Sequence, residues 1–305
     1  MKLLIVGGGP AGLTAALYAA RAGAEVELAA SELGGAMLWA GAIENYPGYS
    51  SISGLELTEA MTAPLRHLDR VTIRDGCTIT LLEETENGVR AVCADGLTFT
   101  ADRAILAAGS SYRRLGLADE ERFIGKGLSY CPLCDGAWYS GSPIAVIGGG
   151  SSGAEAALYL AGLDCRVTLV EQEASLKAGS WLADRVRADS RITVRTGWIP
   201  VLLEGTEDLA AVHLNRTNGT VTAAPERLAV DAVFVCIGRE PAAGCVQVKK
   251  NSDGTVAVDQ NLYTSSKRIL AAGDITGSEP PQIITACAQG CRAALQAVHT
   301  FISPC

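Results

Sequence analysis

Two glycine fingerprints of the form GxGxxG constrain the fold of this 305-residue chain more than any other feature. Their six glycines are Gly7, Gly9, Gly12, Gly148, Gly150 and Gly153. In each fingerprint the first glycine allows a sharp turn, the second lets the backbone approach a pyrophosphate, and the third lets a helix pack against a strand. The helix that follows offers free N–H groups and the positive end of its dipole to the phosphates.

Apolar runs and alanine-rich stretches place both fingerprints between a strand and a helix. The elements predicted around them are strands at 3–6 and 24–30 with a helix ending near 23, and strands at 144–147 and 166–170 with a helix at 154–163. An acid at the end of the second strand can bind ribose hydroxyls, and the candidates are Glu32 and Glu171. Glu32 fits equally well as a solvated loop charge. One fingerprint is weak evidence, but two in this setting indicate two dinucleotide-binding units.

The rest of the chain predicts that the first domain is split. The other predicted elements are a loop at 33–49, a helix at 51–70, an antiparallel meander at 71–82, 88–94 and 97–100, strands at 104–108, 192–195, 209–214, 231–237 and 269–272, and a helix at 283–302. Gly109 closes one of these strands, and Gly273-Asp274 closes the last. We therefore predict an α/β fold with two Rossmann-like three-layer nucleotide-binding domains. The first covers 1–112 and 242–305, and the second, 113–241, is inserted into it.

A pair of cysteines with redox spacing lies between the two fingerprints, in the segment Cys131-Pro132-Leu133-Cys134-Asp135-Gly136. Two thiols at this spacing can close a disulfide or open to a dithiol, and the pair lowers the pKa of one thiol. Asp135 could deliver or remove protons as the pair changes state. Alone, the motif fits half a zinc site equally well. Its position between two dinucleotide fingerprints favours flavin and nicotinamide chemistry.

Composition narrows the class of protein further. A net charge of −8 argues against nucleic acid as a partner. The chain has ten cysteines, and the four in apolar runs are expected to be small core residues: Cys77, Cys93, Cys165 and Cys236. Many unpaired thiols are typical of a reducing cytoplasm. We expect no signal peptide and no membrane-spanning stretch.

The motifs GGGPAG, IENYPG, CPLCDG, GGGSSGAEAA and AAGD occur in an order that resembles the low-molecular-weight thioredoxin reductases over essentially the whole chain. The resemblance implies a homodimeric flavoprotein with FAD in the split domain and a nicotinamide cofactor in the inserted one. It implies that Cys134 faces the flavin, that Cys131 attacks the disulfide of thioredoxin or a similar small protein, and that Asp135 is the family's acid. Trp138-Tyr139 fit either an apolar docking surface for that partner or the core.

The resemblance also implies which residues hold the cofactors. Together with Glu32, the FAD-site candidates are Gly7, Gly9, Pro10, Ala11, Gly12, Gly35, Asn45, Gly109, Gly273, Asp274 and Gln282. The nicotinamide-site candidates are Gly148, Gly150, Gly153 and Glu171. No metal ligands are expected.

Two departures from the family pattern bear on the electron donor. Most members use NADPH and carry a basic HRR run after the second strand of the inserted domain, where this chain has Glu171-Gln172-Glu173. Two carboxylates repel a 2′-phosphate, and one can accept both ribose hydroxyls, so NADH is favoured over NADPH. The segment is more similar to the NADH-using alkyl hydroperoxide reductase flavoproteins, which share this core. The second departure is Pro281, where an Arg usually precedes the Gln at 282.

Three functions compete. The first is an NAD(P)H-dependent reductase of thioredoxin or a similar disulfide protein. The reduction potential of thioredoxin allows its disulfide to be reduced by a nicotinamide. The second keeps the flavin and dithiol but takes electrons from ferredoxin, without a nicotinamide. The third is an FAD-dependent dithiol oxidase, although such relatives often have His after the second cysteine, where Asp135 stands. A non-enzymatic nucleotide-binding protein would leave CPLCDG without a use.

Overall fold

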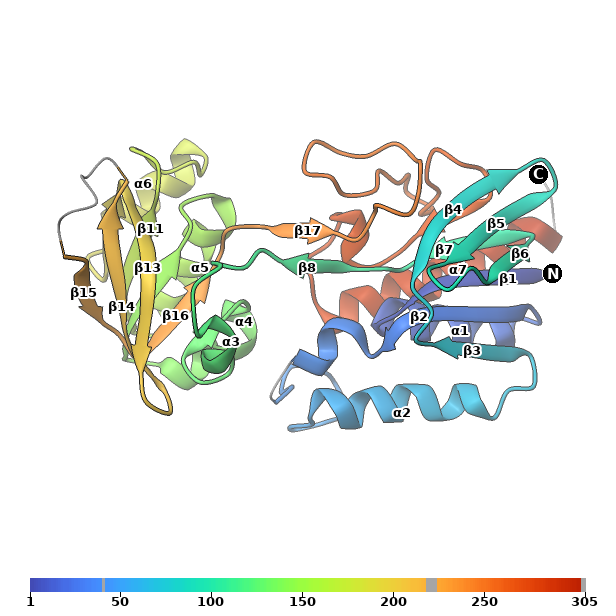
Figure 1. Ribbon diagram of the computed structural model, residues 1–305, viewed down its shortest axis with the longest axis horizontal. Helices are drawn as coiled ribbons and strands as arrows, with labels where there is room; N and C mark the ends of the chain where they lie inside the picture. Colours follow the sequence, from blue (N-terminus) through green and yellow to red (C-terminus); the bar gives the residue numbers. More distant parts are fainter. Residues whose placement is uncertain (40–41, 218–223, 303–305) are drawn as a thin grey trace. The chain divides into compact units, whose positions relative to one another are not determined.

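The computed structural model describes residues 1–39, 42–217 and 224–302, and the chain forms two compact units. Unit 1 comprises residues 1–111 and 240–305, and unit 2 comprises residues 112–239. The chain passes between the units twice, along strands β8 (Ser110–Tyr112) and β17 (Arg239–Pro241). Figure 1 shows these two strands side by side, and they pair as a two-stranded sheet.

Unit 1 is built on a five-stranded parallel sheet of order β18-β7-β1-β2-β3. Its strands are β1 (Lys2–Gly8), β2 (Glu25–Leu33), β3 (Val71–Asp75), β7 (Arg103–Leu106) and β18 (Ile269–Ala271). Alternate residues of β1 enter different cores, since Leu3 and Ile5 pack with the helices and Leu4 and Val6 pack on the other face. The sheet is therefore buried on both sides, as parallel sheets are.

Helices cover one face of this sheet and a second sheet covers the other. The helices are α1 (Pro10–Arg21), α2 (Gly54–Arg66) and α7 (Ile283–Ile302), and the antiparallel strands are β4 (Ile79–Thr85), β5 (Gly88–Cys93) and β6 (Thr98–Ala101). Helices α1 and α7 lie close together, because a Cβ added to Gly290 would stand 2.1 Å from the Ala11 carbonyl oxygen. Unit 1 is thus a three-layer structure (Figure 1).

The structure corrects three sequence predictions in unit 1. The run 71–82 is not one meander strand: β3 is the parallel edge strand beside β2, and β4 begins only at Ile79. Gly76, with φ +78°, provides the turn that separates them. The predicted loop at 33–49 contains a 3-10 helix, η1 (Gly35–Trp39). Helix α2 is shorter than predicted because a capping box between Ser53 and Glu56 fixes its start.

Unit 2 repeats the three-layer plan around a parallel sheet of order β12-β11-β10-β16-β9. These strands are β9 (Leu128–Ser129), β10 (Pro143–Ile147), β11 (Arg166–Glu171), β12 (Ile192–Thr196) and β16 (Ala232–Val235). Helices α5 (Ser151–Gly162) and α6 (Ser180–Ala188) share one apolar core with Ile144 and Val146. Ala145 and Ile147 face the opposite core, beneath an antiparallel sheet. The predicted α/β architecture of two Rossmann-like units is confirmed.

Two strands of that antiparallel sheet were not predicted from the sequence. The sheet consists of β13 (Trp198–Gly205), β14 (Leu209–Arg216) and β15 (Glu226–Ala229), of which only β14 was expected. Strand β13 contains Pro200, and its register shifts between Pro200 and Leu202. Strand β15 is exposed at Glu226 and Arg227. The proline and the bulge interrupt the alternating pattern of β13, and the polar surface of β15 gives it no apolar pattern, so neither strand was recognised in the sequence.

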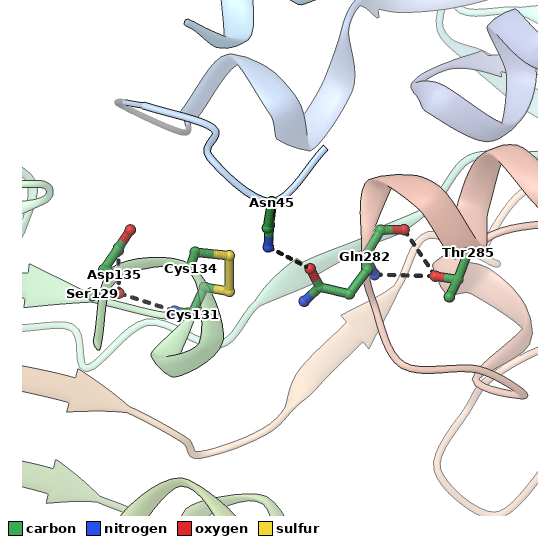
Figure 2. The surroundings of a disulfide bond; sticks show 7 residues. All are labelled: Asn45, Ser129, Cys131, Cys134, Asp135, Gln282 and Thr285. Carbon is green, nitrogen blue, oxygen red and sulfur yellow. Dashed lines mark hydrogen bonds between the residues drawn. A yellow bond between two sulfur atoms is a disulfide. The ribbon is translucent and has the colours of Figure 1, made fainter. Parts of the chain in front are cut away.

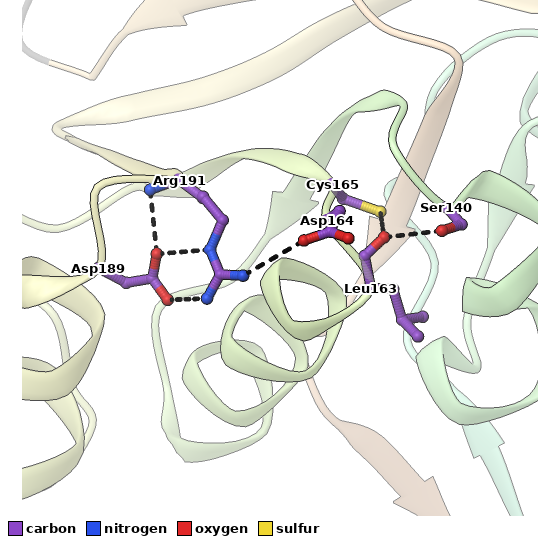
Figure 3. A network of polar contacts seen from close by, with 6 residues as sticks. All are labelled: Ser140, Leu163, Asp164, Cys165, Asp189 and Arg191. Carbon is purple, nitrogen blue, oxygen red and sulfur yellow. Dashed lines mark hydrogen bonds and ion pairs between the residues drawn. The ribbon is translucent and has the colours of Figure 1, made fainter.

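The segment that follows the CxxC motif is anchored to the end of α5. After the short helices α4 (Pro132–Asp135) and η2 (Gly136–Tyr139), the Ser140 hydroxyl donates to the Leu163 carbonyl at 2.9 Å (Figure 3). The Cys165 thiol lies 3.1 Å from the Tyr139 carbonyl oxygen. Nearby, Arg191 forms two side-chain hydrogen bonds with Asp189.

No helix within the described ranges is both long and apolar enough to cross a membrane.

Candidate active site

The first glycine loop joins β1 to α1 and has an open face. Gly7 has φ +116°, and a Cβ added to Gly12 would stand 1.8 Å from the Gly7 carbonyl oxygen. A Cβ on Gly9 would instead have its nearest neighbour 3.9 Å away. Pro10 occupies the first turn of α1, where its missing N–H costs nothing. The free N–H groups of that turn and the bare backbone at Gly9 therefore fit a dinucleotide phosphate.

Other predicted FAD-site residues converge on this loop. A Cβ on Gly35 would lie 3.3 Å from the Cα of Gly9, and one on Gly273 would lie 2.9 Å from the Cβ of Ala11. Asp274 follows directly and opens η3 (Asp274–Thr276). The end of β18 and the loop after β2 thus meet at the start of α1.

Gln289 is a positioning residue that the sequence analysis missed. It is buried on α7, and its Oε1 atom accepts a hydrogen bond from the Gly273 N–H at 2.7 Å. Its side-chain amide donates to the Ser278 hydroxyl at 2.9 Å. The signal in the sequence was a polar side chain among the small apolar residues of an amphipathic helix. A buried polar group of this kind needs partners, and here it fixes the turn before Asp274.

Asn45 and Gln282 are brought together from positions 237 residues apart. The Asn45 side-chain amide donates to Gln282 Oε1 at 3.1 Å (Figure 2). Thr285 holds the backbone of Gln282, since its hydroxyl donates to the Gln282 carbonyl at 2.9 Å. Both residues were predicted to touch the flavin, and the structure places them as a pair.

Two other FAD-site candidates, Glu32 and Gly109, lie near the first glycine loop, and a Cβ added to Gly8 would stand 2.9 Å from the Glu32 carbonyl oxygen. The two units can be compared through their strand registers. In unit 1 Val6 pairs with Ala29, and in unit 2 Ile147 pairs with Val170. The residue of unit 1 that corresponds to Glu171 is therefore Ala30 and not Glu32. Glu32 lines an open depression with Ser31, Asp75 and Gly76. Gly109, with φ +70°, comes two residues after Ala107, whose carbonyl oxygen lies against Gly7. The roles of both remain predictions.

The second glycine loop has the same geometry as the first. Gly148 has φ +113°, and a Cβ on Gly153 would stand 1.8 Å from the Gly148 carbonyl oxygen. A Cβ on Gly150 would meet no atom within 4 Å. Here too the loop is closed on the side of the sheet and bare at its middle glycine, so it fits a second dinucleotide.

Glu171 is held against this loop by backbone groups. Its carboxylate accepts a hydrogen bond from the Gly149 N–H at 2.6 Å and another from the Glu173 N–H at 2.8 Å. Glu173 in turn pairs with Lys177 at 3.2 Å, and the Lys177 N–H donates to the Gly149 carbonyl. The segment after β11 therefore folds back on the glycine loop with a buried carboxylate at its centre.

The CxxC motif forms a closed disulfide in unit 2. Cys131 and Cys134 are bonded, with their Cα atoms 5.3 Å apart (Figure 2). The N–H groups of Cys134 and Asp135 both donate to the Cys131 carbonyl at 3.1 Å. Burial raises the pKa of the Asp135 carboxyl, and a hydrogen bond from Ser129 opposes that rise. A carboxyl with a raised pKa keeps its proton to a higher pH than an ordinary aspartate, which suits a proton donor.

The surface around the disulfide is apolar. Leu133 is 54% exposed and Trp138 is 49% exposed. Tyr139 is half-buried, and its ring meets the edge of Phe234 at a centroid distance of 5.9 Å. Of the two aromatic residues after the motif, Trp138 therefore faces outward and Tyr139 belongs to the core.

Comparisons with known proteins agree with this arrangement. The family model described as pyridine nucleotide-disulphide oxidoreductase matches residues 1–290. An alkyl hydroperoxide reductase protein of Staphylococcus aureus is 34% identical over 304 residues, which cover 98% of this chain and 59% of the relative. The chain thus spans little more than half the length of that relative.

Solved structures of thioredoxin reductases match along the whole chain. The enzyme from Streptococcus pyogenes has a TM-score of 0.90 and 32% identity, covering 99% of this chain and 98% of its own. The enzyme from Lactococcus lactis has a TM-score of 0.65 and 30% identity, covering 99% of each. The resemblance to the thioredoxin reductases is confirmed. The chain belongs to the pyridine nucleotide-disulphide oxidoreductase family, and its fold is similar to that of the thioredoxin reductases.

Proposed function

We propose that this chain is an FAD-dependent disulfide reductase that takes electrons from NADH and passes them through the Cys131–Cys134 pair to thioredoxin or a similar small protein. The observation that supports this most is the disulfide itself, with a partly buried carboxyl beside it, in a chain that has two open dinucleotide loops. The overall reaction converts NADH, a proton and a partner disulfide into NAD⁺ and the partner dithiol.

A bound flavin supplies hydride acceptance from a reduced nicotinamide and two-electron transfer to a disulfide. The protein's own part begins when the bond between Cys131 and Cys134 breaks. Two electrons enter the two sulfurs, which leaves Cys131 as a thiolate and Cys134 as a thiol whose proton Asp135 can supply. The two partner thiolates released in the following steps take up the two protons of the overall reaction. The Cys131 thiolate then attacks the partner disulfide and releases one partner thiolate. Cys134 attacks the mixed disulfide, releases the second partner thiolate and restores the Cys131–Cys134 bond.

Unit 1 is proposed as the FAD-binding unit. Support comes from the convergence of Gly35, Gly273 and Asp274 on the first glycine loop, and from the Asn45–Gln282 pair. Amide groups such as these can donate to and accept from a flavin ring, and an Asp at the start of a turn can accept from hydroxyl groups of the cofactor chain.

Unit 2 is proposed to bind NADH in preference to NADPH. Glu171 keeps its carboxylate beside the middle of the glycine loop, where ribose hydroxyls can donate to it. A 2′-phosphate at that point would face Glu171 and Glu173. The one lysine of the segment, Lys177, is already paired with Glu173. A site that binds the 2′-phosphate of NADPH needs a cationic side chain that is available to it, and this segment presents carboxylates instead.

The side chains near the disulfide and the unpaired cysteines bear on the partner protein and the cellular compartment. The exposed Leu133 and Trp138 beside the disulfide support docking of a small protein that carries its own disulfide. Seven other cysteines within the described ranges form no disulfide, which supports a reducing compartment such as the cytoplasm. We expect a homodimer, as the family resemblance implies.

Anaerobic titration of the yellow protein tests the donor. NADH, NADPH and reduced ferredoxin are added in separate experiments while flavin absorbance is followed, and NADH should bleach the flavin fastest. Bleaching by reduced ferredoxin alone would replace this proposal with the ferredoxin-dependent alternative, which Pro281 leaves open. Reoxidation by thioredoxin should then restore the absorbance. If oxygen restores it and thioredoxin does not, the protein is a dithiol oxidase instead.

A further inference from the structure

Ser129 occupies a position that connects both ends of the CxxC motif. It is 5% exposed and ends β9, just before the motif. Its hydroxyl donates to Asp135 Oδ2 at 2.6 Å and accepts a hydrogen bond from the Cys131 N–H at 3.0 Å. Figure 2 shows the serine lying between the aspartate and the first cysteine. One buried hydroxyl thus contacts the residue after the second cysteine and the backbone of the first.

The place of Ser129 is set by the sheet and not by the loop. Strand β9 pairs in parallel with β16, where Ser129 lies opposite Phe234 and Leu128 lies opposite Val233. Both Phe234 and Leu128 are fully or almost fully buried. The hydroxyl is therefore a fixed point beside a four-residue helix, and it can hold the motif through changes in the state of the disulfide.

Asp135 depends on this contact. Among the described residues, Ser129 is the one hydrogen-bond donor that the structure records for the Asp135 carboxylate. A buried carboxylate is costly unless it accepts hydrogen bonds, so loss of this donor favours the protonated form. Burial already raises the pKa of Asp135, and the Ser129 hydrogen bond is the influence that lowers it.

We propose that Ser129 is a positioning residue for disulfide exchange: it holds the Asp135 carboxyl in place and tethers the Cys131 backbone while the bond between the two sulfurs opens and closes. The proposal rests on the proposed disulfide reduction and assigns that reaction a residue outside the CxxC motif. In the proposed reaction Asp135 is the acid that supplies a proton to the opened pair, and Ser129 sets the place from which that proton is delivered.

The elements packed against α4 carry few other titratable groups. Helix η2 carries Tyr139, and helix α5 carries Tyr159 and the exposed Glu155. Asp231 precedes β16, the strand that pairs with β9. Burial first, and the charge of Asp135 second, raise the pKa of Tyr139, so this tyrosine stays neutral in the range of the experiment. Below about pH 9, the groups of the motif that change protonation are then Asp135 and the two thiols of the reduced pair.

The test uses chemical reduction, so it needs neither nicotinamide nor partner protein. The rate at which dithiothreitol reduces the Cys131–Cys134 disulfide in the purified flavoprotein is measured against pH, for Ser129→Ala and the wild type. We expect the variant to be about tenfold slower near neutral pH, because a misplaced acid loses part of its usual contribution. We also expect the inflection assigned to Asp135 to move to higher pH. A merely structural role would lower the rate equally at all pH values.

Three variants control the result. Ser129→Thr keeps the hydroxyl and should restore the wild-type inflection. Ser140→Ala removes another serine hydroxyl of the same unit, which bonds to Leu163, and should match the wild type (Figure 3). Asp135→Asn cannot titrate, so the inflection should vanish. In that background, Ser129→Ala should have little further effect on the pH profile.

Two outcomes would overturn the proposal. One is an inflection that Ser129→Ala leaves unmoved, and the other is an inflection that persists in Asp135→Asn. The second outcome decides the matter even if Ser129→Ala does not fold. Failure of NADH to reduce the flavin would contradict the proposed function, but it would not affect the measurements with dithiothreitol. Failure of the proposed function can therefore be distinguished from failure of the role proposed for Ser129.

Discussion

The carboxylate of Glu171 accepts a hydrogen bond from the Gly149 N–H at 2.6 Å, which joins the end of β11 to the turn after β10. Glu171 is buried, and a second N–H, from Glu173, completes its contacts. The acid is therefore oriented before any ligand arrives. If unit 2 binds NADH as proposed, this orientation lets the carboxylate accept from two ribose hydroxyls without further rearrangement.

The first prediction concerns Glu171. Glu171→Gln should weaken reduction of the flavin by NADH by about ten- to a hundredfold, since hydrogen bonds to a charged group contribute about 1.5–3 kcal/mol. Reduction by NADPH should change less, because that nucleotide gains little from the carboxylate. Stopped-flow bleaching at matched nucleotide concentrations gives both rates. Equal losses for the two nucleotides would contradict a role in donor choice.

The second prediction reverses the charge of the segment. Glu171→Arg together with Glu173→Arg should narrow or invert the preference for NADH, because two cations replace two carboxylates at the 2′ position. The matched control is Glu155→Arg, an exposed change on α5 that alters the net charge without touching this segment. If the control shifts the preference as far as the double variant, the effect is general electrostatics and not recognition.

Local signals in the sequence account for the parts of the fold that were predicted correctly. The fingerprint glycines are needed by the backbone itself, as the φ values of Gly7 and Gly148 show, so sequence spacing was enough to find them. The parallel strands β1 and β10 are uniform apolar runs, so they too could be recognised from the local sequence. Strand β3 was assigned to the wrong sheet, because short alternation does not reveal which neighbour a strand pairs with.

The contacts that complete the site depend on distant parts of the chain. Asn45 and Gln282 were each predicted from motifs, but nothing in the sequence indicated that they bond to each other. Gln289 was overlooked because its partner, Gly273, becomes visible only when α7 packs on α1. Ser129 lies six residues from Asp135, yet its role depends on the pairing of β9 with β16. Such partners are set by tertiary packing, which sequence spacing does not encode.

The third prediction separates the two dinucleotide sites. Gly153→Ala should abolish reduction by NADH while the protein keeps its FAD, because the added Cβ would stand 1.8 Å from the Gly148 carbonyl oxygen and displace the loop. Gly162→Ala, in the same helix, is the control, since its Cβ would meet no atom within 4 Å. Flavin content by absorbance and bleaching by NADH are the measurements. Loss of FAD in Gly153→Ala would contradict the assignment of the two units.

The fourth prediction concerns the redox pair. Cys131→Ser and Cys134→Ser should each lower reduction of thioredoxin by roughly a thousandfold or more, as loss of a nucleophile does in other enzymes. NADH should still bleach the flavin in both variants, because neither sulfur belongs to the nicotinamide unit's glycine loop. Cys291→Ser, a partly buried thiol on α7, should behave as the wild type. Full activity in both CxxC variants would show that electrons take another route.

The fifth prediction concerns the stability of unit 2 at acidic pH. Glu204 on β13 accepts hydrogen bonds from Arg227 on β15 and bonds to His213 on β14, so it ties three strands together. Arg227 first, and His213 second, lower the pKa of Glu204 from 4.5 to about 2. A lowered pKa in the folded state means stability that is present above pH 4.5 and is lost as the pH falls toward about 2.

Glu204→Gln should therefore lower the thermal midpoint of unit 2 at neutral pH, and its difference from the wild type should shrink as the pH falls below 4.5. Tryptophan fluorescence reports on this unit when Trp39 of unit 1 is replaced by Phe in every protein compared, because Trp138, Trp181 and Trp198 lie in unit 2. Glu207→Gln, an exposed carboxyl in the turn between β13 and β14, is the control and should follow the wild type at every pH. A deficit in Glu204→Gln that stays constant down to about pH 3 would show that packing of the side chain, and not its charge, stabilises the sheet.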